Sequence, residues 1–285
     1  MAETLFEVST DKGPIAGWES GPGPALLFLH GGPGLSDYGD LLGPEVADWR
    51  MVHYQQRGLA PSSLDGPFTV EQHIADAVAV LEARTTGPVI VVGHSFGVHL
   101  AMQLALAHPD RVAGLVLIDG LGATGDGGVT DLAAALTERL LPGAAERLAA
   151  ARMADHEPTD ADVTEQTALL WPGYFAEPAT APPWPPAMRV SAAAYAGTMA
   201  SVFEHLTAGF AESVGAISVP AIFVLGAQSP MPVSHGEQTA ALIPSAQVRV
   251  IPAAGHLPWV EHPGCVADAL ASMRTLTGDP KTPAA

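Results

Sequence analysis

The chain has 285 residues, of which 48% are hydrophobic, so it can bury a large core and is not wholly disordered. Asp and Glu number 30 against 12 Lys and Arg, and the net charge of −18 argues against nucleic acid and anionic membranes as partners. Cys265 is the single cysteine, which excludes an intrachain disulfide. Residues 1–4 lack a basic leader, and no uncharged apolar run reaches about 18 residues, so we expect a cytoplasmic protein.

The chain begins with short segments of strand character. Residues 4–9 and 14–18 alternate in polarity and predict a β-hairpin. The apolar run 25–29 has no alternation, as expected for a strand buried on both faces. A short helix at 37–48 and a strand at 49–54 are predicted next.

Helices and strands then alternate regularly. Apolar residues recur at helical spacing over 69–84, with Thr69 as a natural N-cap. A strand at 88–92, a helix that ends near Ala107 and a buried strand at 112–118 follow. This alternation predicts the α/β class, with a mostly parallel sheet covered by helices on both faces.

The alternation stops between 121 and 213, where no buried strand is evident. Ala- and Leu-rich stretches at 130–141 and 144–154 predict helices, followed by a Pro-rich aromatic segment and further helix. Because such sheets bind ligands beyond their strand ends, we expect this insertion to form a helical cap over the site.

The α/β pattern resumes after the insertion. Strands are predicted at 219–225 and 248–251, and helices at 235–243 and 263–276. We expect a core domain formed by residues 1–120 and 214–277. A cap at 121–213 and a flexible tail at 278–285 complete the expected organisation.

A candidate nucleophile lies between the predicted strand at 88–92 and the helix after it. Ser95 occupies the centre of Gly93-His94-Ser95-Phe96-Gly97, a G-x-S-x-G pattern. A serine at a tight strand-to-helix turn has an exposed hydroxyl, and the glycines let neighbouring backbone approach. The alternative is a glycine-rich loop with a chance serine. The flanking strand and helix favour the nucleophile over this alternative.

A serine nucleophile needs a base and donors for the oxyanion. His256 follows the last predicted strand and is the best candidate for the base, although a lone His is more often a packing residue. The loop His30-Gly31-Gly32-Pro33-Gly34 could supply the N–H of Gly32, and Phe96 could supply a second N–H. The alternative for that loop is a Gly-Pro turn without function. His30 and His94 are interpreted as structural.

Taken together, these motifs resemble the α/β-hydrolase superfamily. The resemblance rests on the serine motif, the loop 30–34, the inserted cap and Gly-His-x-x-x-x-Glu at 255–261. Tyr54-Gln55-Gln56-Arg57-Gly58 with Ser62 is similar to proline iminopeptidases, which usually have Asp where this chain has Gln55. The same fold carries out several chemistries, so the resemblance does not identify the substrate.

The catalytic acid is the member of the site that departs from the pattern the resemblance implies. The resemblance implies an Asp in the loop after the penultimate strand, and Ser229 occupies that position. Asp119, at the end of the strand at 112–118, is the natural substitute for orienting His256. The alternatives are another carboxylate, Glu237 or Asp126, or no acid at all.

Aromatic residues concentrated in the cap predict an apolar pocket, although each of them alone could equally be core. Phe96, Tyr195 and Phe203 are further candidates, and the principal expected wall residues are Leu35, Trp171, Tyr174, Phe175 and Trp184. An aminopeptidase would also need carboxylates facing the site, for which the available candidates are Glu165, Glu177 and Glu204.

No metal or cofactor is expected, because H-E-x-x-H, C-x-x-C and a G-x-G-x-x-G after the first parallel strand are missing. The leading hypothesis is a serine hydrolase that cleaves an ester or amide of a small, mainly apolar substrate through an acyl-enzyme. Two alternatives remain: a non-hydrolytic or carbon–carbon bond enzyme that uses His256 as acid and base, and a binding protein without turnover. The sequence does not indicate the oligomeric state.

Overall fold

The computed structural model describes residues 3–153 and 156–278 and contains one eight-stranded sheet. The strand order is β1-β2-β4-β3-β5-β6-β7-β8. The pairs β1–β2 and β2–β4 are antiparallel, and all the other neighbouring pairs are parallel. The predicted α/β class is confirmed. The strands are β1 (Thr4–Thr10), β2 (Gly13–Ser20), β3 (Ala25–Leu29), β4 (Arg50–Tyr54), β5 (Val89–His94), β6 (Val112–Ile118), β7 (Ala221–Gly226) and β8 (Ala246–Ile251).

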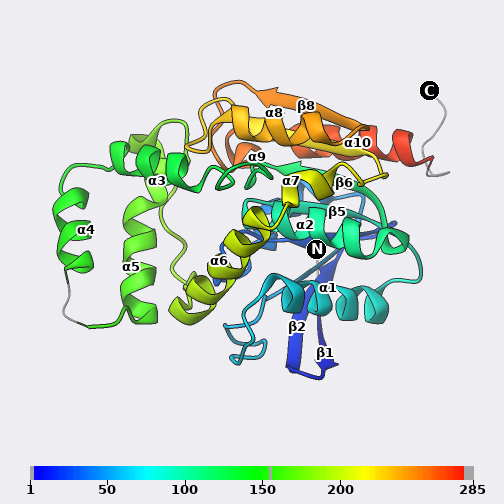
Figure 1. Ribbon diagram of the computed structural model, residues 1–285, viewed down its shortest axis with the longest axis horizontal. Coiled ribbons are helices and arrows are strands. Elements are labelled where there is room, and N and C mark those ends of the chain that lie inside the picture. Colours follow the sequence, from blue (N-terminus) through cyan, green and yellow to red (C-terminus); the bar gives the residue numbers. More distant parts are fainter. Residues whose placement is uncertain (1–2, 154–155, 279–285) are drawn as a thin grey trace.

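Helices cover both faces of the sheet (Figure 1). Helices α1 (Val70–Arg84), α2 (Phe96–Ala107), α7 (Phe210–Val214) and α8 (Val233–Leu242) pack on one face. The 3₁₀ helix η1 (Gly39–Val46), α9 (Pro258–Glu261) and α10 (Cys265–Thr277) pack on the other. The short helix predicted at 37–48 is thus a 3₁₀ helix, with Pro44 inside it. Burial of the central strands on both faces explains their unbroken apolar runs.

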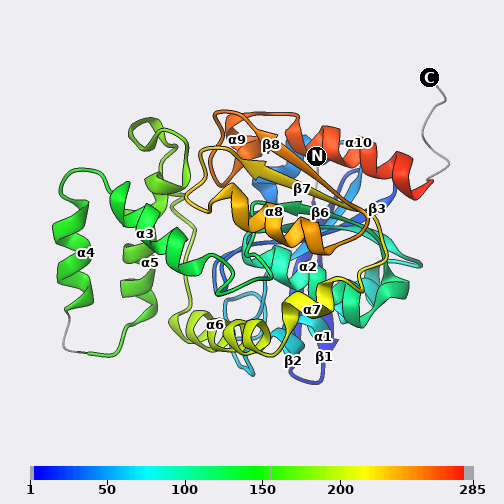
Figure 2. The same ribbon diagram turned by 45° about the horizontal axis from the view of Figure 1, so that its top comes forward.

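The segment between β6 and β7 stands to one side of the sheet, as Figures 1 and 2 show for α3, α4 and α5. The helix predicted at 130–141 ends earlier than expected, at Glu138. The helix at 160–170 was not specifically predicted. Besides α7, the elements between β6 and β7 are α3 (Val129–Glu138), α4 (Ala144–Arg152), α5 (Asp160–Leu170), η3 (Trp171–Tyr174), η4 (Pro178–Thr180) and α6 (Ala192–Thr207).

The boundary expected between cap and core at 213 falls inside α7 (Phe210–Val214). Phe210 and Val214 of this helix are buried in the core, where α7 contacts α2 and α8. The predicted tail 278–285 lies outside the described residues except for Gly278, which ends α10. The remaining short element is η2 (Pro109–Arg111). None of the described helices is long and apolar enough to cross a membrane.

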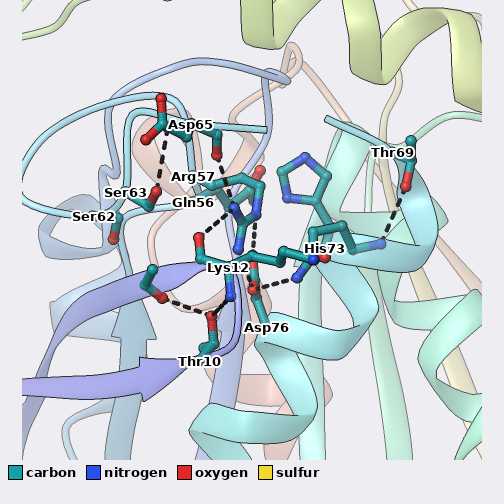
Figure 3. A network of polar contacts seen from close by, with 12 residues as sticks. Thr10, Lys12, Gln56, Arg57, Ser62, Ser63, Asp65, Thr69, His73 and Asp76 are labelled. Carbon is teal, nitrogen blue, oxygen red and sulfur yellow. Dashed lines mark hydrogen bonds and ion pairs between the residues drawn. The ribbon is translucent and has the colours of Figure 1, made fainter. Parts of the chain in front are cut away.

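Arg57, in the segment 54–58, is the centre of a buried polar network (Figure 3). The guanidinium of Arg57 is fully buried and donates to both carboxylate oxygens of Asp76 in α1, each at 2.7 Å. It also donates to the backbone oxygens of Lys12 and Asp65, at 3.2 and 2.9 Å. Breaking such a pair would leave an uncompensated buried charge. The network therefore ties the first hairpin and the loop after β4 to α1, and its role is structural.

Candidate active site

Ser95 lies at the sharp turn from β5 into α2, as the motif predicted. Its φ of 56° and ψ of −121° fall in a region that non-glycine residues rarely adopt. The turn requires glycine nearby, because a Cβ at Gly97 would lie 1.9 Å from the backbone oxygen of Leu29, and one at Gly93 would lie 2.4 Å from that of Gly97. The tight backbone leaves the Ser95 hydroxyl half-buried at the wall of a cavity.

His256 lies beside Ser95, and its Nε2 is 3.0 Å from the Ser95 Oγ. The His256 backbone N–H donates to the Tyr174 carbonyl at 2.7 Å, so η3 helps to hold the histidine loop. Burial lowers the pKa of His256 to about 3. The imidazole is therefore neutral near pH 7 and able to accept the proton of the serine hydroxyl.

Asp119 and Ser229 both face the other ring nitrogen of His256. The Oδ1 of Asp119 lies 3.7 Å from Nδ1, and the Ser229 Oγ lies 3.5 Å from it. The second oxygen of Asp119 accepts the Gly226 N–H at 3.0 Å, which orients the carboxyl group. Burial raises the pKa of Asp119 well above its usual range, and hydrogen bonds from Gly226 and Ser229 oppose that rise.

The other carboxylates considered for the acid lie elsewhere. Asp126 accepts the backbone N–H groups of Gly128 and Thr130 at the start of α3, where it acts as a local cap. Glu237 is exposed on α8. Asp119 is thus the candidate acid that the structure places beside the imidazole.

The expected oxyanion donors belong to two different elements, the loop after β3 and the first turn of α2. Gly32 lines the cavity with a φ of 134°, a conformation that suits glycine. Phe96 is the first residue of α2, and the N–H groups of a helix's first turn lack partners within the helix. The Phe96 side chain is fully buried against His73, with the ring centroids 5.8 Å apart, so it does not line the cavity.

Tyr38 was not identified from the sequence, yet it links the two loops around Ser95. Its hydroxyl accepts the Gly31 N–H at 2.5 Å and lies 2.6 Å from Nδ1 of His94. The Nε2 of His94 lies 2.8 Å from the carbonyl oxygen of His256. These partners determine which group donates in each hydrogen bond. His94 donates to the His256 carbonyl and accepts from the Tyr38 hydroxyl, which in turn accepts the Gly31 N–H. Burial lowers the pKa of His94 well below its usual range, so the ring is neutral and can do both.

A cavity of about 290 Å³ opens next to Ser95 and His256. Four of the five principal wall residues predicted from the sequence line it, namely Leu35, Trp171, Tyr174 and Trp184, and so does Tyr195. The fifth prediction, Phe175, is wrong: this side chain is buried against Trp171, at a centroid distance of 5.0 Å. The cap candidate Phe203 is also outside the lining and is 39% exposed.

Much of the remaining wall comes from aliphatic residues of α3 and α5. Their apolar spacing predicts helices, but nothing in the sequence distinguishes a side chain that faces a cavity from one that faces core. No Asp or Glu belongs to the lining within the part of the chain that the structure describes. Glu165 instead pairs with Arg147 at 2.7 Å on the surface. The additional apolar wall residues are Val129, Leu132, Ala133, Leu136, Val163, Leu170, Val190 and Leu257.

Comparison with known proteins places this geometry in a family. A lipase of Mycobacterium tuberculosis, LipV, is 37% identical over 101 residues, 34% of this chain and 38% of the lipase. The proline iminopeptidase PfmaB of Pestalotiopsis fici is 35% identical over 100 residues, 33% of this chain and 35% of that protein. The chain thus matches less than half the length of these relatives.

Solved structures match over nearly the whole length. A hydrolase from Pseudomonas aeruginosa superposes with a TM-score of 0.70 and 25% identity, over 95% of this chain and 98% of that one. A proline iminopeptidase-related protein from Thermus thermophilus superposes with a TM-score of 0.66 and 22% identity, over 98% of this chain and 99% of that one. The model of the alpha/beta hydrolase fold family matches residues 24–263. The resemblance inferred from the motifs is confirmed, and the chain belongs to the alpha/beta hydrolase fold family.

Proposed function

We propose that this protein is a serine hydrolase that cleaves an ester of a small, apolar, uncharged substrate through an acyl-enzyme. The observation that carries the proposal is the 3.0 Å contact between the Ser95 Oγ and the neutral His256 Nε2 at the wall of an apolar cavity. A nucleophile and base within hydrogen-bond reach, with a third group behind the base, meet the requirement for covalent catalysis.

The reaction follows from these positions. Ser95 Oγ attacks the carbonyl carbon as its proton passes to His256 Nε2, and the carbonyl oxygen becomes an oxyanion. The N–H groups of Gly32 and Phe96 are the donors we assign to that oxyanion. His256 then gives the proton to the leaving alcohol. Water attacks the acyl-enzyme with His256 again as base, and the free acid leaves.

Asp119 acts on His256 in this scheme. Burial removes water from the Asp119 carboxylate and so raises its pKa, and the neutral imidazole beside it supplies no counter-charge to offset that rise. When Ser95 transfers its proton, the imidazolium supplies that counter-charge. The attraction is therefore stronger in the transition state than in the resting enzyme, which is the condition for it to accelerate the reaction. Ser229 serves as a hydrogen-bonding partner of both groups.

The cavity wall supports an uncharged ester rather than an N-terminal amine as the substrate. An aminopeptidase binds a terminal ammonium, and burying that charge without a counter-charge is costly. The described wall residues offer aliphatic and aromatic side chains with a few polar groups such as Gln166 and Thr167, and no carboxylate. Such a wall suits an apolar acyl or alcohol group. The names of the relatives, a lipase and a proline iminopeptidase, include both substrate types.

Initial rates of hydrolysis test the proposal directly. We expect turnover of p-nitrophenyl esters with short to medium acyl chains, little turnover of proline p-nitroanilide, and loss of ester turnover in Ser95→Ala. Ester hydrolysis that persists in Ser95→Ala would exclude Ser95 as nucleophile and favour chemistry that relies on His256 alone. Faster cleavage of the proline anilide than of every ester would reverse the substrate assignment.

A further inference from the structure

A second cluster of ionisable side chains lies outside the cavity, where the start of β1, the 3₁₀ helix η1 and strand β4 meet. It consists of Glu3, Asp40 and His53, whose ligand-type atoms all lie within 4.8 Å of one another. Glu3 and Asp40 are exposed, whereas His53 is only 1% exposed. Two neighbouring carboxylates repel each other unless a cation or a proton lies between them. The cluster thus combines an accessible negative entrance with a buried imidazole.

His53 is oriented as metal-binding histidines usually are. Its Nδ1 lies 2.6 Å from Asp37 Oδ2, a carboxylate that is itself nearly buried. In the neutral ring with its proton on Nδ1, that proton is donated to Asp37, which leaves the lone pair of Nε2 free for a metal ion and fixes the ring plane. Nε2 is buried and makes no hydrogen bond with any of the described residues, and it points toward Glu3.

The spacing of the donor atoms fits one small cation. His53 Nε2 lies 3.5 Å from Glu3 Oε1. Two ligands of a tetrahedral Zn²⁺ with bonds of about 2.1 Å lie about 3.4 Å apart. The exposed side chain of Asp40 can complete the set by rotation about its own bonds, with water as a fourth ligand. One imidazole with carboxylate oxygens suits Zn²⁺ better than Mg²⁺ or Ca²⁺, which prefer oxygen ligands alone.

We propose that Glu3, Asp40 and His53 form a binding site for a divalent transition-metal ion of the Zn²⁺ class, oriented by Asp37 and separate from the cavity of Ser95. The bound ion joins the segment before β1 to η1 and β4. It stabilises the folded chain by mass action, because the three residues come together only on folding. The three lie in separate segments, so no spacing motif in the sequence could have indicated this site.

Isothermal titration of untagged, chelator-treated protein with ZnCl₂ tests the site. We expect one strong site in the wild type, with affinity reduced at least about tenfold in Glu3→Gln and in Asp40→Asn. Both side chains are exposed, so these variants should fold. The matched control is Glu71→Gln, which removes the carboxylate of another imidazole–carboxylate pair, that with His205 at 2.7 Å. It should bind Zn²⁺ as the wild type does.

Thermal unfolding provides the second measurement. Zn²⁺ should raise the melting temperature of the wild type and Glu71→Gln, but not that of Glu3→Gln or Asp40→Asn, and Mg²⁺ should raise none of them. Two outcomes overturn the proposal. One is no Zn²⁺ binding by the wild type up to millimolar concentration, which would mean that His53 carries a proton and forms an ion pair with Glu3. The other is unchanged binding in both variants.

Discussion

The Ser229 Oγ lies 3.5 Å from the Nδ1 of His256, at the chain position where the α/β-hydrolase resemblance implied an acid. The nearest carboxylate oxygen of Asp119 lies 3.7 Å from the same nitrogen, beyond the range of a normal hydrogen bond. Asp119 comes from the end of β6, and Ser229 from the loop after β7. Two groups from adjacent strands thus share the side of His256 that is remote from Ser95, and only Asp119 can supply charge.

Replacing Asp119 by Asn should reduce kcat by about 10⁴-fold, as expected when the group that holds the base in its tautomer loses its charge. The substitution keeps the shape of the side chain, and the Gly226 N–H can still donate to its amide oxygen. Steady-state ester hydrolysis measures the effect. A loss of less than tenfold would show that Asp119 is not the acid.

Ser229 allows a rescue experiment. Ser229→Ala alone should reduce kcat by no more than about tenfold, because it removes hydrogen bonds to His256 and Asp119 but leaves the charge of Asp119 in place. Ser229→Asp in the Asp119→Asn background moves the carboxylate to the other loop, and we expect it to restore at least part of the lost kcat. The opposite ranking, with Ser229→Ala more damaging than Asp119→Asn, would contradict the assignment.

Tyr38→Phe should reduce kcat and lower the free energy of unfolding by about 1–3 kcal/mol, because the Gly31 N–H and the His94 ring each lose a buried partner. The matched control is Tyr54→Phe. The Tyr54 hydroxyl is also buried but has no partner among the described residues, so its removal should cost nothing. Urea unfolding and ester kinetics of both variants give the comparison, and equal effects in the two would count against the Tyr38 link.

The buried histidines should make the protein less stable in acid. Burial lowers the pKa of His99 to about 3, and neither of its ring nitrogens has a partner among the described residues. In the unfolded chain the pKa of His is about 6.5, so below that pH the unfolded state binds a proton that the folded state does not. This imidazole contributes stability that is present above pH 6.5 and is lost as the pH falls toward 3.

His99→Leu isolates that contribution. Between pH 7.5 and pH 5.5, the unfolding free energy of the wild type should fall by about 1.4 kcal/mol more than that of the variant. Urea titrations of both proteins at the two pH values give the four unfolding free energies needed for this comparison. An equal fall in both proteins would mean that His99 takes up its proton without unfolding.

The sequence predicted the candidate catalytic residues around Ser95, but not the hydrogen bonds through Tyr38 that link the loops carrying them. Ser95, His256 and Asp119 each follow a parallel strand, and parallel strands bring their ends to one edge, so local patterns suffice to group them. The link through Tyr38 depends on the rotamers of residues 56 positions apart. The burial of Phe175 against Trp171 depends on how the cap segment packs, which periodicity does not determine.

The most direct test of the central claim is covalent labelling with a fluorophosphonate probe, followed by peptide mass spectrometry of the wild type and His256→Ala. The probe reacts with a serine only when a neighbouring base activates the hydroxyl. We predict stoichiometric labelling of the wild type at Ser95 alone, and labelling slowed by several orders of magnitude in His256→Ala. A folded wild-type protein that remains unlabelled at Ser95, or that is labelled equally fast without His256, would contradict the account.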